Sequence, residues 1–344
     1  MGSRTMGRTP PIRRLVELAT RAPSVHNTQP WFWGVDSDRL VLFADRSRQL
    51  MHADPDGRDL ILSCGAALHH VQVAAAGAGW RPVVRRMPDA YNDAHLANIS
   101  FHPEPATPAA RAAVDALERR RTDRRSPTSS PVPRGQLDRL LGLGPPAGVT
   151  IFAVVSRQAR TELLQILAEA DRQQREDRDY VDEIVRWTGR VDGEGIPSSS
   201  LLRRDSGVGR ADPVPTGPPP RFPSGSLVDD SHSPEVEPVL LAVCTSSDDT
   251  ASRLRAGEAL GAMLVHGTVA GMAMVPLSQA IEVDRTRVLL QDDLLSDTAS
   301  PQIVVQVGWA PPGRIQVPLT RRRPVDDVLG DVSSLPPGIG PYHP

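Results

Sequence analysis

The chain has 344 residues and a formal net charge of -2, and apolar residues make up 39% of it, or about 47% once its 27 glycines are added. That share falls within the globular range of roughly 45–50%, and the length allows one large domain or two of ordinary size. The charge excludes a dedicated nucleic-acid binder, which needs a large basic excess. Because no apolar run reaches the ~18 residues of a membrane span and none follows the basic N-terminus as in a signal peptide, we expect a soluble, cytoplasmic protein with no membrane partner.

The reactive side chains are few in kind. The two cysteines, Cys64 and Cys244, lie far apart without metal-ligand spacing, so we expect neither a disulfide framework nor a metal site. All 39 basic residues are arginine. This removes the lysine amine that Schiff-base and P-loop chemistry require.

Hydrophobic periodicity and turn residues predict alternating helices and strands, which is typical of the α+β class. The first part is expected to contain a helix over 12–20, a hairpin of 31–35 with 40–43, and helices over 57–79 and 108–121. The second part is expected to contain a helix over 136–143, a strand over 149–155, a helix over 161–187, a strand over 238–244, a helix over 256–274 and a strand over 302–309.

A proline-rich insert of about 189–238 interrupts the second part. It holds most of the excess among the 34 prolines and few apolar residues. A segment this long without regular structure, inside a compact domain, is usually a lid over a site or a disordered linker. We favour the lid, because the insert connects no further domain, and we expect Trp187 or Phe222 to lie near the site that it covers.

The chain also repeats itself. Residues 65–74 shifted by 196 positions fall on residues 261–270, with six of the ten identical, among them Gly65/Gly261 and His70/His266. Each segment is preceded by a strand pattern and followed by a proline and a further apolar stretch. This predicts an internal duplication, with two small-residue helices packed closely together.

The most informative segment is 22–31, APSVHNTQPW, which predicts a helix-to-strand corner held by two prolines. It presents the hydroxyl of Ser24, the imidazole of His26 and the amides of Asn27 and Gln29. Such groups suit edge-on hydrogen bonding to a flat heterocycle, although the composition alone fits a turn equally well.

This string resembles the APSxxNxQPW signature with which the FMN-dependent nitroreductase superfamily lines the isoalloxazine ring, which implies contacts from Pro23, Ser24, His26, Asn27 and Gln29. Residues 120–125, RRTDRR, resemble the RRSxR element with which that family holds the FMN phosphate and ribityl chain. In an extended chain Arg120, Thr122 and Arg124 share one face, with Arg121 between them. Arginine binds phosphate through charge-assisted hydrogen bonds.

Two further stretches match less closely. The family commonly places basic residues on the phosphate from near the C-terminus, where this chain has Arg322 and Arg323. After the second small-residue helix the family carries a Pro-x-Glu-Gly pattern near the reactive flavin atom N5. Here the corresponding stretch is 275–279, VPLSQ, so Ser278 and Gln279 are the implied ring contacts and the family's carboxylate is missing.

The order of the motifs implies a fused pseudo-dimer. Ordinary nitroreductases place the phosphate arginines before the corner and build each site between two chains, whereas here the corner comes first. We therefore expect a nitroreductase-like fold of two tandem repeats, 1–105 and 106–344, with helices around central mixed sheets and one FMN between them. A monomer then suffices. With residues 54–58 and 63–68, this layout resembles the Acg-type branch of actinobacteria.

The resemblance implies an FMN-dependent NAD(P)H oxidoreductase acting on nitroaromatics or quinones, small aromatic electron acceptors. The alternative is a protein that sequesters or stores flavin under a closed lid and turns over little. No residue is assigned a catalytic role. His26 is more often a turn or core residue than a proton donor, Cys64 a buried hydrophobe, and His70 and His266 packing residues.

Overall fold

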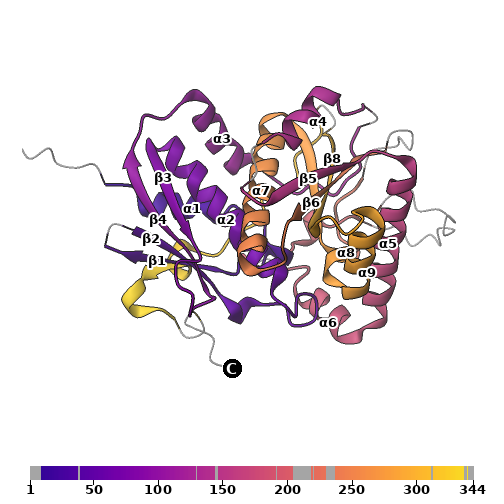
Figure 1. The fold of residues 1–344 in the computed structure, drawn as a ribbon, viewed down its shortest axis with the longest axis horizontal. Coiled ribbons are helices and arrows are strands. Elements are labelled where there is room, and N and C mark those ends of the chain that lie inside the picture. The colour runs from indigo at the N-terminus through magenta and orange to yellow at the C-terminus, as the bar shows by residue number, and fades with distance from the viewer. Residues whose placement is uncertain are drawn as a thin grey trace, which may run out of the picture.

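The structure is a computed structural model that describes residues 9–37, 39–128, 130–143, 146–190, 192–203, 218–219, 221–229, 237–310, 313–336 and 339. Its elements form two groups, each around its own sheet (Figure 1). The first group comprises α1 (Ile12–Ala19), β1 (Trp31–Asp36), β2 (Arg39–Ala44), α2 (Arg58–Gly77), β3 (Trp80–Arg86), β4 (His95–Pro103) and α3 (Pro108–Arg119). The second comprises α4 (Arg134–Leu141), β5 (Val149–Val154), α5 (Arg157–Glu176), α6 (Arg178–Arg186), β6 (Val239–Thr245), α7 (Thr250–Val269), β7 (Met272–Leu277), α8 (Gln279–Glu282), α9 (Asp284–Leu289) and β8 (Ser300–Trp309).

The predicted elements are confirmed apart from two helices whose bounds were wrong. The helix expected over 161–187 is two helices, because Asp177 is extended and its carboxylate accepts the N–H groups of Asp179 and Tyr180, capping α6. The helix expected over 256–274 ends at Val269. Gly271 has a φ of 78°, which no helix can continue, and β7 begins directly after it.

The two sheets share one strand order. The first runs β3-β4-β2-β1-β9 and the second, read from its β7 edge, runs β7-β8-β6-β5. The four corresponding strands, β3-β4-β2-β1 in the first sheet and β7-β8-β6-β5 in the second, pair antiparallel with their neighbours. In the first group, the hairpin of β1 and β2 precedes the long helix α2. In the second group, the corresponding strands β5 and β6 do not form a hairpin, because α5, α6 and the insert separate them in the chain.

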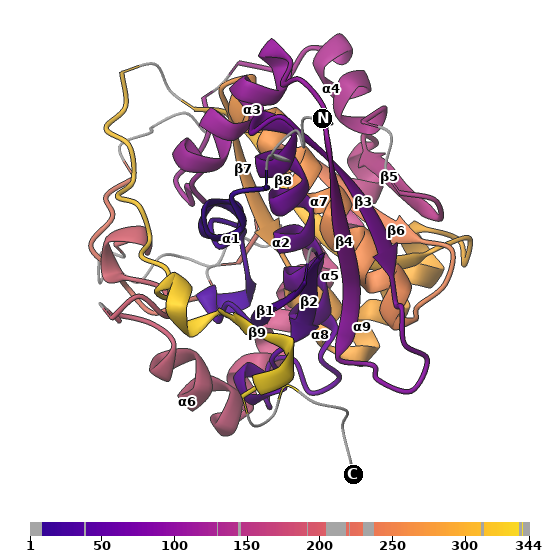
Figure 2. The same ribbon diagram turned by 90° about the vertical axis from the view of Figure 1, so that its left-hand side faces the viewer.

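The C-terminal segment returns to the first sheet. Strand β9 (Leu329–Asp331) pairs parallel with β1, joining Trp33 to Leu329 and Val35 to Asp331, which makes that sheet mixed. Figure 2 shows this segment passing α1 before it reaches β9. The expected division of the chain into repeats 1–105 and 106–344 remains a prediction. Residues 329–331 belong to the second repeat in sequence but pair with a strand of the first.

Helices α2 and α7 pack against each other between the two sheets (Figure 1). A Cβ on Gly65 would lie 2.9 Å from the Cα of Gly257, and a Cβ on Gly257 would lie 2.8 Å from the Cα of Gly65. Each would also collide with a carbonyl oxygen of the other helix, that of Leu254 or that of Leu62. Only glycine fits where two helix backbones touch in this way.

These contacts show that α2 corresponds to α7 after a shift of 192 residues. The expected shift of 196 residues is about one helical turn longer. The bounds of α2 and α7 differ by 192 at both ends, and the left-handed glycines that follow them, Gly79 and Gly271, differ by the same number. The reciprocal contacts of Gly65 and Gly257 also obey it. The shift of 196 matches six of ten letters, three of them Gly or Ala, in which both helices are rich.

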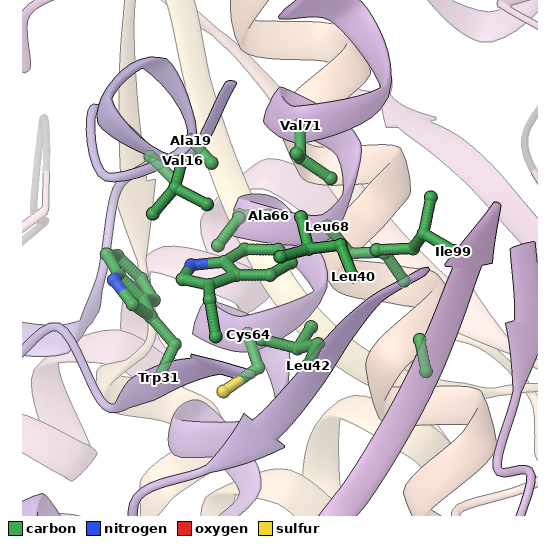
Figure 3. Close-up of a cluster of buried hydrophobic side chains, with 14 of the residues drawn as sticks. Val16, Ala19, Trp31, Leu40, Leu42, Cys64, Ala66, Leu68, Val71 and Ile99 are labelled. Carbon is green, nitrogen blue, oxygen red and sulfur yellow. The ribbon is translucent and has the colours of Figure 1, made fainter. Parts of the chain in front are cut away.

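The larger hydrophobic core lies between α2 and the first sheet. Figure 3 shows Trp31, Leu40 and Leu42 of the β1–β2 hairpin against Cys64 and Leu68 of α2. Helix α2 is long and apolar enough to cross a membrane by length and composition, but 72% of its most apolar window is buried within the protein. Burial between two sheets accounts for its nearly uniform apolar surface.

Candidate functional site

A cavity of about 670 Å³ lies where the two groups meet. Helix α2 contributes Asp59, Leu62 and Ser63 to its wall, and α7 contributes Leu260. The remaining wall comes from Arg21 and the corner, the segment after α3, the insert, the β7–α8 junction, strand β8, and Leu319, Thr320 and Arg322. Small-molecule sites typically have volumes of about 300–1,000 Å³ and this mixture of apolar and polar lining.

The corner is a strained piece of backbone. His26, Asn27 and Gln29 have φ angles of 44°, 59° and 51°, a region that residues other than glycine rarely adopt. The Ser24 hydroxyl accepts the N–H of Gln29 at 3.0 Å, and the Ser63 hydroxyl of α2 accepts the N–H of Val25 at 3.1 Å. Such strain persists where surrounding structure enforces it, and it clusters at binding sites.

Most of the corner residues that the sequence singled out line the cavity, but Gln29 does not. Pro23, Ser24, His26 and Asn27 contribute to the wall. Gln29 is 0% exposed; its amide donates to the carbonyl of Gly193 at 2.9 Å and accepts the N–H of Arg323 at 2.8 Å. It therefore holds the corner to the insert and to the C-terminal segment.

Four arginines converge on one end of the cavity: Arg21, Arg120, Arg121 and Arg322. Arg120 donates to the carbonyl of Arg21 at 3.0 Å and Arg322 to that of Thr20 at 2.8 Å, so the C-terminal end of α1 orients both guanidinium groups. Within the described part of the chain none of these arginines forms an ion pair with a carboxylate, and the Nε and Nη1 atoms of Arg120 have no partner.

The electrostatics of this end favour an anion. Burial, followed by the charges of Arg121 and Arg21, lowers the pKa of Arg120 to about 10. Burial and the charges of Arg120 and Arg21 lower the pKa of Arg322 to about 9. Burial also lowers the pKa of Arg121. All three still carry their charge at neutral pH, and an anion that accepts from them would relieve both their mutual repulsion and their unmet donors.

The middle of the arginine segment faces the same cavity. Thr122 and Arg124 line it, as an extended chain predicts, because α3 ends at Arg119 and Arg120 has an extended ψ of 133°. The Arg124 guanidinium donates to the carbonyl of Ser200 at 3.1 Å and lies 5.0 Å from the centre of the Phe222 ring. Arg323, by contrast, does not line the cavity. Its Nη1 lies 3.4 Å from the carbonyl of Gln29.

The described parts of the insert form one side of the cavity; residues 191, 204–217, 220 and 230–236 lie outside the described residues. Phe222 lies in the wall, and its ring meets that of His26 edge to face at 5.5 Å. Trp187 does not line the cavity but packs with Tyr180 and Ile184 behind it.

A cluster of carboxyl groups at the cavity wall went unnoticed in the sequence. Asp59 lines the cavity in the first turn of α2, near Asp54 and Glu282. Arg221 from the insert donates to Glu282 at 2.7 Å, to the hydroxyl of Ser278 at 3.0 Å and to that of Tyr180 at 3.0 Å. The one available signal was Asp59 itself, a charged residue inside an otherwise apolar helix pattern.

Ser278 and Gln279, the expected ring contacts, both line the cavity. Ser278 donates to Glu282 at 2.6 Å. Glu282 thus supplies a carboxylate close to where the family's pattern has one, four residues later in the chain.

His26 and the two cysteines are buried. Burial, followed by the charges of Arg221 and Arg124, lowers the pKa of His26 well below its usual value, so this imidazole is neutral. Burial raises the pKa of the Cys64 thiol, which therefore stays protonated. No group of three or more His, Cys, Asp or Glu side chains among the described residues is arranged to hold a metal ion.

Comparison with known proteins finds relatives along nearly the whole chain. It is 37% identical over 323 residues to "Putative NAD(P)H nitroreductase Rv3131" of Mycobacterium tuberculosis, covering 92% of this chain and 90% of that protein. It is 36% identical over 330 residues to "Putative NAD(P)H nitroreductase acg" of the same organism, covering 94% and 97%. No family model matches the chain.

Solved structures are more distant. An FMN and NADPH-dependent nitroreductase, NfnB from Sphigopyxis, aligns with a TM-score of 0.40 and 18% identity over 63% of this chain and 96% of that one. A nitroreductase with bound FMN from Bacteroides fragilis aligns with a TM-score of 0.38 and 13% identity over 59% and 91%.

Proposed function

We propose that this chain, which belongs to the family of the mycobacterial NAD(P)H nitroreductases Rv3131 and Acg, binds one FMN in its large cavity and reduces nitroaromatics or quinones with NAD(P)H. The observation that carries the proposal is the pairing of an unneutralised arginine end with apolar and amide-bearing walls in one cavity. A flavin mononucleotide has the same two parts, a phosphate and a flat heterocycle.

The residues present fit that group. Arg120, Arg121 and Arg322 would hold the phosphate, and Arg120 has two donors that nothing else satisfies within the described residues. The corner and the β7–α8 junction would contact the ring through Asn27, Ser278 and Gln279. Bound there, FMN would supply hydride transfer, while the protein orients it and keeps water from the buried end.

A single chain would form this site without a partner. We propose that the halves 1–105 and 106–344 are tandem repeats forming an intramolecular pseudo-dimer, supported by the common strand order and the reciprocal contact of Gly65 with Gly257. Leu62 from one half and Leu260 from the other meet across the cavity wall. A monomer with one FMN follows from this arrangement.

Replacing the arginines tests FMN binding directly. Arg120→Ala and Arg322→Ala are each expected to weaken flavin binding by about 10- to 150-fold, because a hydrogen bond to a charged group contributes roughly 1.5–3 kcal/mol. Arg119→Ala removes an exposed arginine next to Arg120 and is the matched control. The flavin content of the purified variants, read from the visible spectrum, is the measurement. Full retention in both variants contradicts the phosphate assignment.

A second function, flavin sequestration, is favoured by the insert. Arg221 anchors it by three polar contacts, and Phe222 forms part of the cavity wall. An anaerobic visible spectrum before and after addition of NADPH, and then of NADH, separates the two functions. Rapid loss of the oxidised flavin bands supports the reductase. Persistent bands that dithionite nevertheless bleaches support sequestration under a closed lid.

A further inference from the structure

The side chain of Asp59 lies between two cavities. It lines the large one, and it also lines a small one of about 10 Å³ together with Asp54, Asp56 and Glu282. That volume corresponds to roughly one water molecule. Asp56 is exposed, so the small cavity lies next to the surface, and Asp59 separates the candidate flavin site from solvent.

Asp59 has no counter-charge of its own. It is 4% exposed, and its Oδ2 accepts no hydrogen bond from the described residues. Arg221 forms an ion pair with Glu282. The carboxylate of Glu282 also accepts hydrogen bonds from Gln174 at 2.7 Å and from Ser278. Arg58, one residue away, donates instead to Asp248 and Gln302.

The other groups facing Asp59 also favour its neutral form. Asp54 accepts the N–H groups of Asp59 and Leu60 at 3.1 and 2.8 Å, which places a second carboxyl beside the start of α2. The carboxyl of Glu282 also lies near that of Asp59, and two ionised carboxylates, which can only accept hydrogen bonds, would repel each other there. Burial, then Glu282 and Asp54, raise the pKa of Asp59 well above its usual value, although Arg221 lowers it.

We propose that Asp59 is the general acid of the large cavity: neutral in the resting protein, it protonates the electron acceptor and is reprotonated from solvent through the small cavity. This inference rests on the proposed reductase function. A quinone acceptor gains a hydride equivalent, supplied in net terms by NAD(P)H, which is oxidised. Its carbonyl oxygen forms an O–H bond as the O–H bond of Asp59 breaks. The remaining carboxylate takes its next proton from water, so protons and electrons balance.

Infrared spectroscopy tests the proton without any cofactor. Wild-type protein at pH 7 is expected to show carbonyl bands of protonated carboxyl groups, shifted in heavy water, from Asp59 and in part from Asp54, whose pKa burial raises to about 7. Asp59→Asn should lose one band and Asp59→Glu should move it, Asp54→Asn identifies the contribution of Asp54, and Asp56→Asn, an exposed carboxyl of the same loop, should leave the bands unchanged. A set of bands that persists unaltered in Asp59→Asn overturns the proposal.

Kinetics test the transfer. Protein reduced with one equivalent of dithionite is mixed anaerobically with 1,4-benzoquinone, which bypasses nicotinamide access. Asp59→Asn is expected to slow reoxidation by about 100-fold, within the range for general acids, and to lose the decline in rate with rising pH. Asp59→Glu should restore part of both, while flavin content stays unchanged. If the wild type is active and Asp59→Asn has the same rate and pH profile, the role of Asp59 is overturned and the reductase function is not. A wild type that reduces no acceptor overturns the reductase function and, with it, this role.

Discussion

The ends of helices α2 and α7 differ, although the helices themselves are equivalent. Both have 20 residues, cross at a glycine and lead through a left-handed glycine into a strand. At the register of 192, however, Asp59 and Ser63 of α2 correspond to Ala251 and Arg255 of α7. The two helices therefore share their length and packing but differ in the polar side chains of their first turns.

The strands that follow the two helices differ in the same way. Ser278 and Gln279 after β7 line the cavity, whereas the equivalent positions after β3 hold Arg86 and Met87. Arg86 donates to the buried carboxylate of Glu258 at 2.6 and 2.7 Å, so an ion pair occupies that end. In a pseudo-symmetric molecule, a few side chains at the helix ends therefore decide which of two equivalent positions can bind a ligand.

Exchanging these side chains should separate the flavin affinity of the two ends. Ser278→Arg places a second cation beside Arg221 and fills part of the cavity, and we expect it to weaken flavin binding by at least about tenfold. Arg86→Ser is the matched exchange in the other half. It should leave flavin content unchanged and cost about 2 kcal/mol of stability, below the ~3–5 kcal/mol of a fully buried pair because Gln72 still bonds Glu258 at 2.8 Å. Equal flavin loss in both variants would contradict the distinction between the two ends.

The helix crossing should respond symmetrically. Gly65→Ala and Gly257→Ala are each expected to lower the free energy of unfolding by about 3 kcal/mol, the upper part of the overpacking range, even though alanine favours helices. Gly135→Ala in α4 is the control, since nothing lies within 4 Å of a Cβ there. Urea unfolding of the three variants checks this. A large effect at only one crossing glycine would be evidence against reciprocal packing.

Acidity should act in opposite directions on the two helix starts. Burial, chiefly, raises the pKa of Asp54 before α2 to about 7. The folded state therefore binds more protons than the unfolded one between pH of about 4 and 7, and stability falls across that window as pH rises, by on the order of 2 kcal/mol.

Before α7, hydrogen bonds from Arg58 and Gln302 outweigh burial and lower the pKa of Asp248 to about 2. Its contribution is present above pH of about 4 and is lost as pH falls toward 2. It amounts to about 1 kcal/mol after allowance for a side chain that is 36% exposed. Urea unfolding from pH 2 to 8 should show the first slope decrease in Asp54→Asn, because Asp59 still contributes to it, and the second slope vanish in Asp248→Asn. Unchanged slopes would count against these assignments.

Much of the fold was predictable because local patterns carried it. Two short apolar runs on either side of a turn in 31–44 predicted the β1–β2 hairpin, and the small apolar run after Gly57 predicted α2. The predicted family is confirmed by its mycobacterial relatives. The break at Asp177 was missed because a helix pattern continues through it, and only the capping geometry reveals that a second helix begins there.

For the site, the sequence by itself determined which segments are present: a corner held by two prolines, an arginine segment and a second small-residue helix. Only the tertiary structure decided which of them meet. Gln29 and Arg323 bond each other outside the cavity, while Asp59, Arg221 and Glu282, which come from three distant segments, gather at its end. The physical reason is that burial and charge pairing depend on neighbours across the fold. A spacing of 192 or 196 likewise looks equivalent in composition until two helix backbones must touch at glycine.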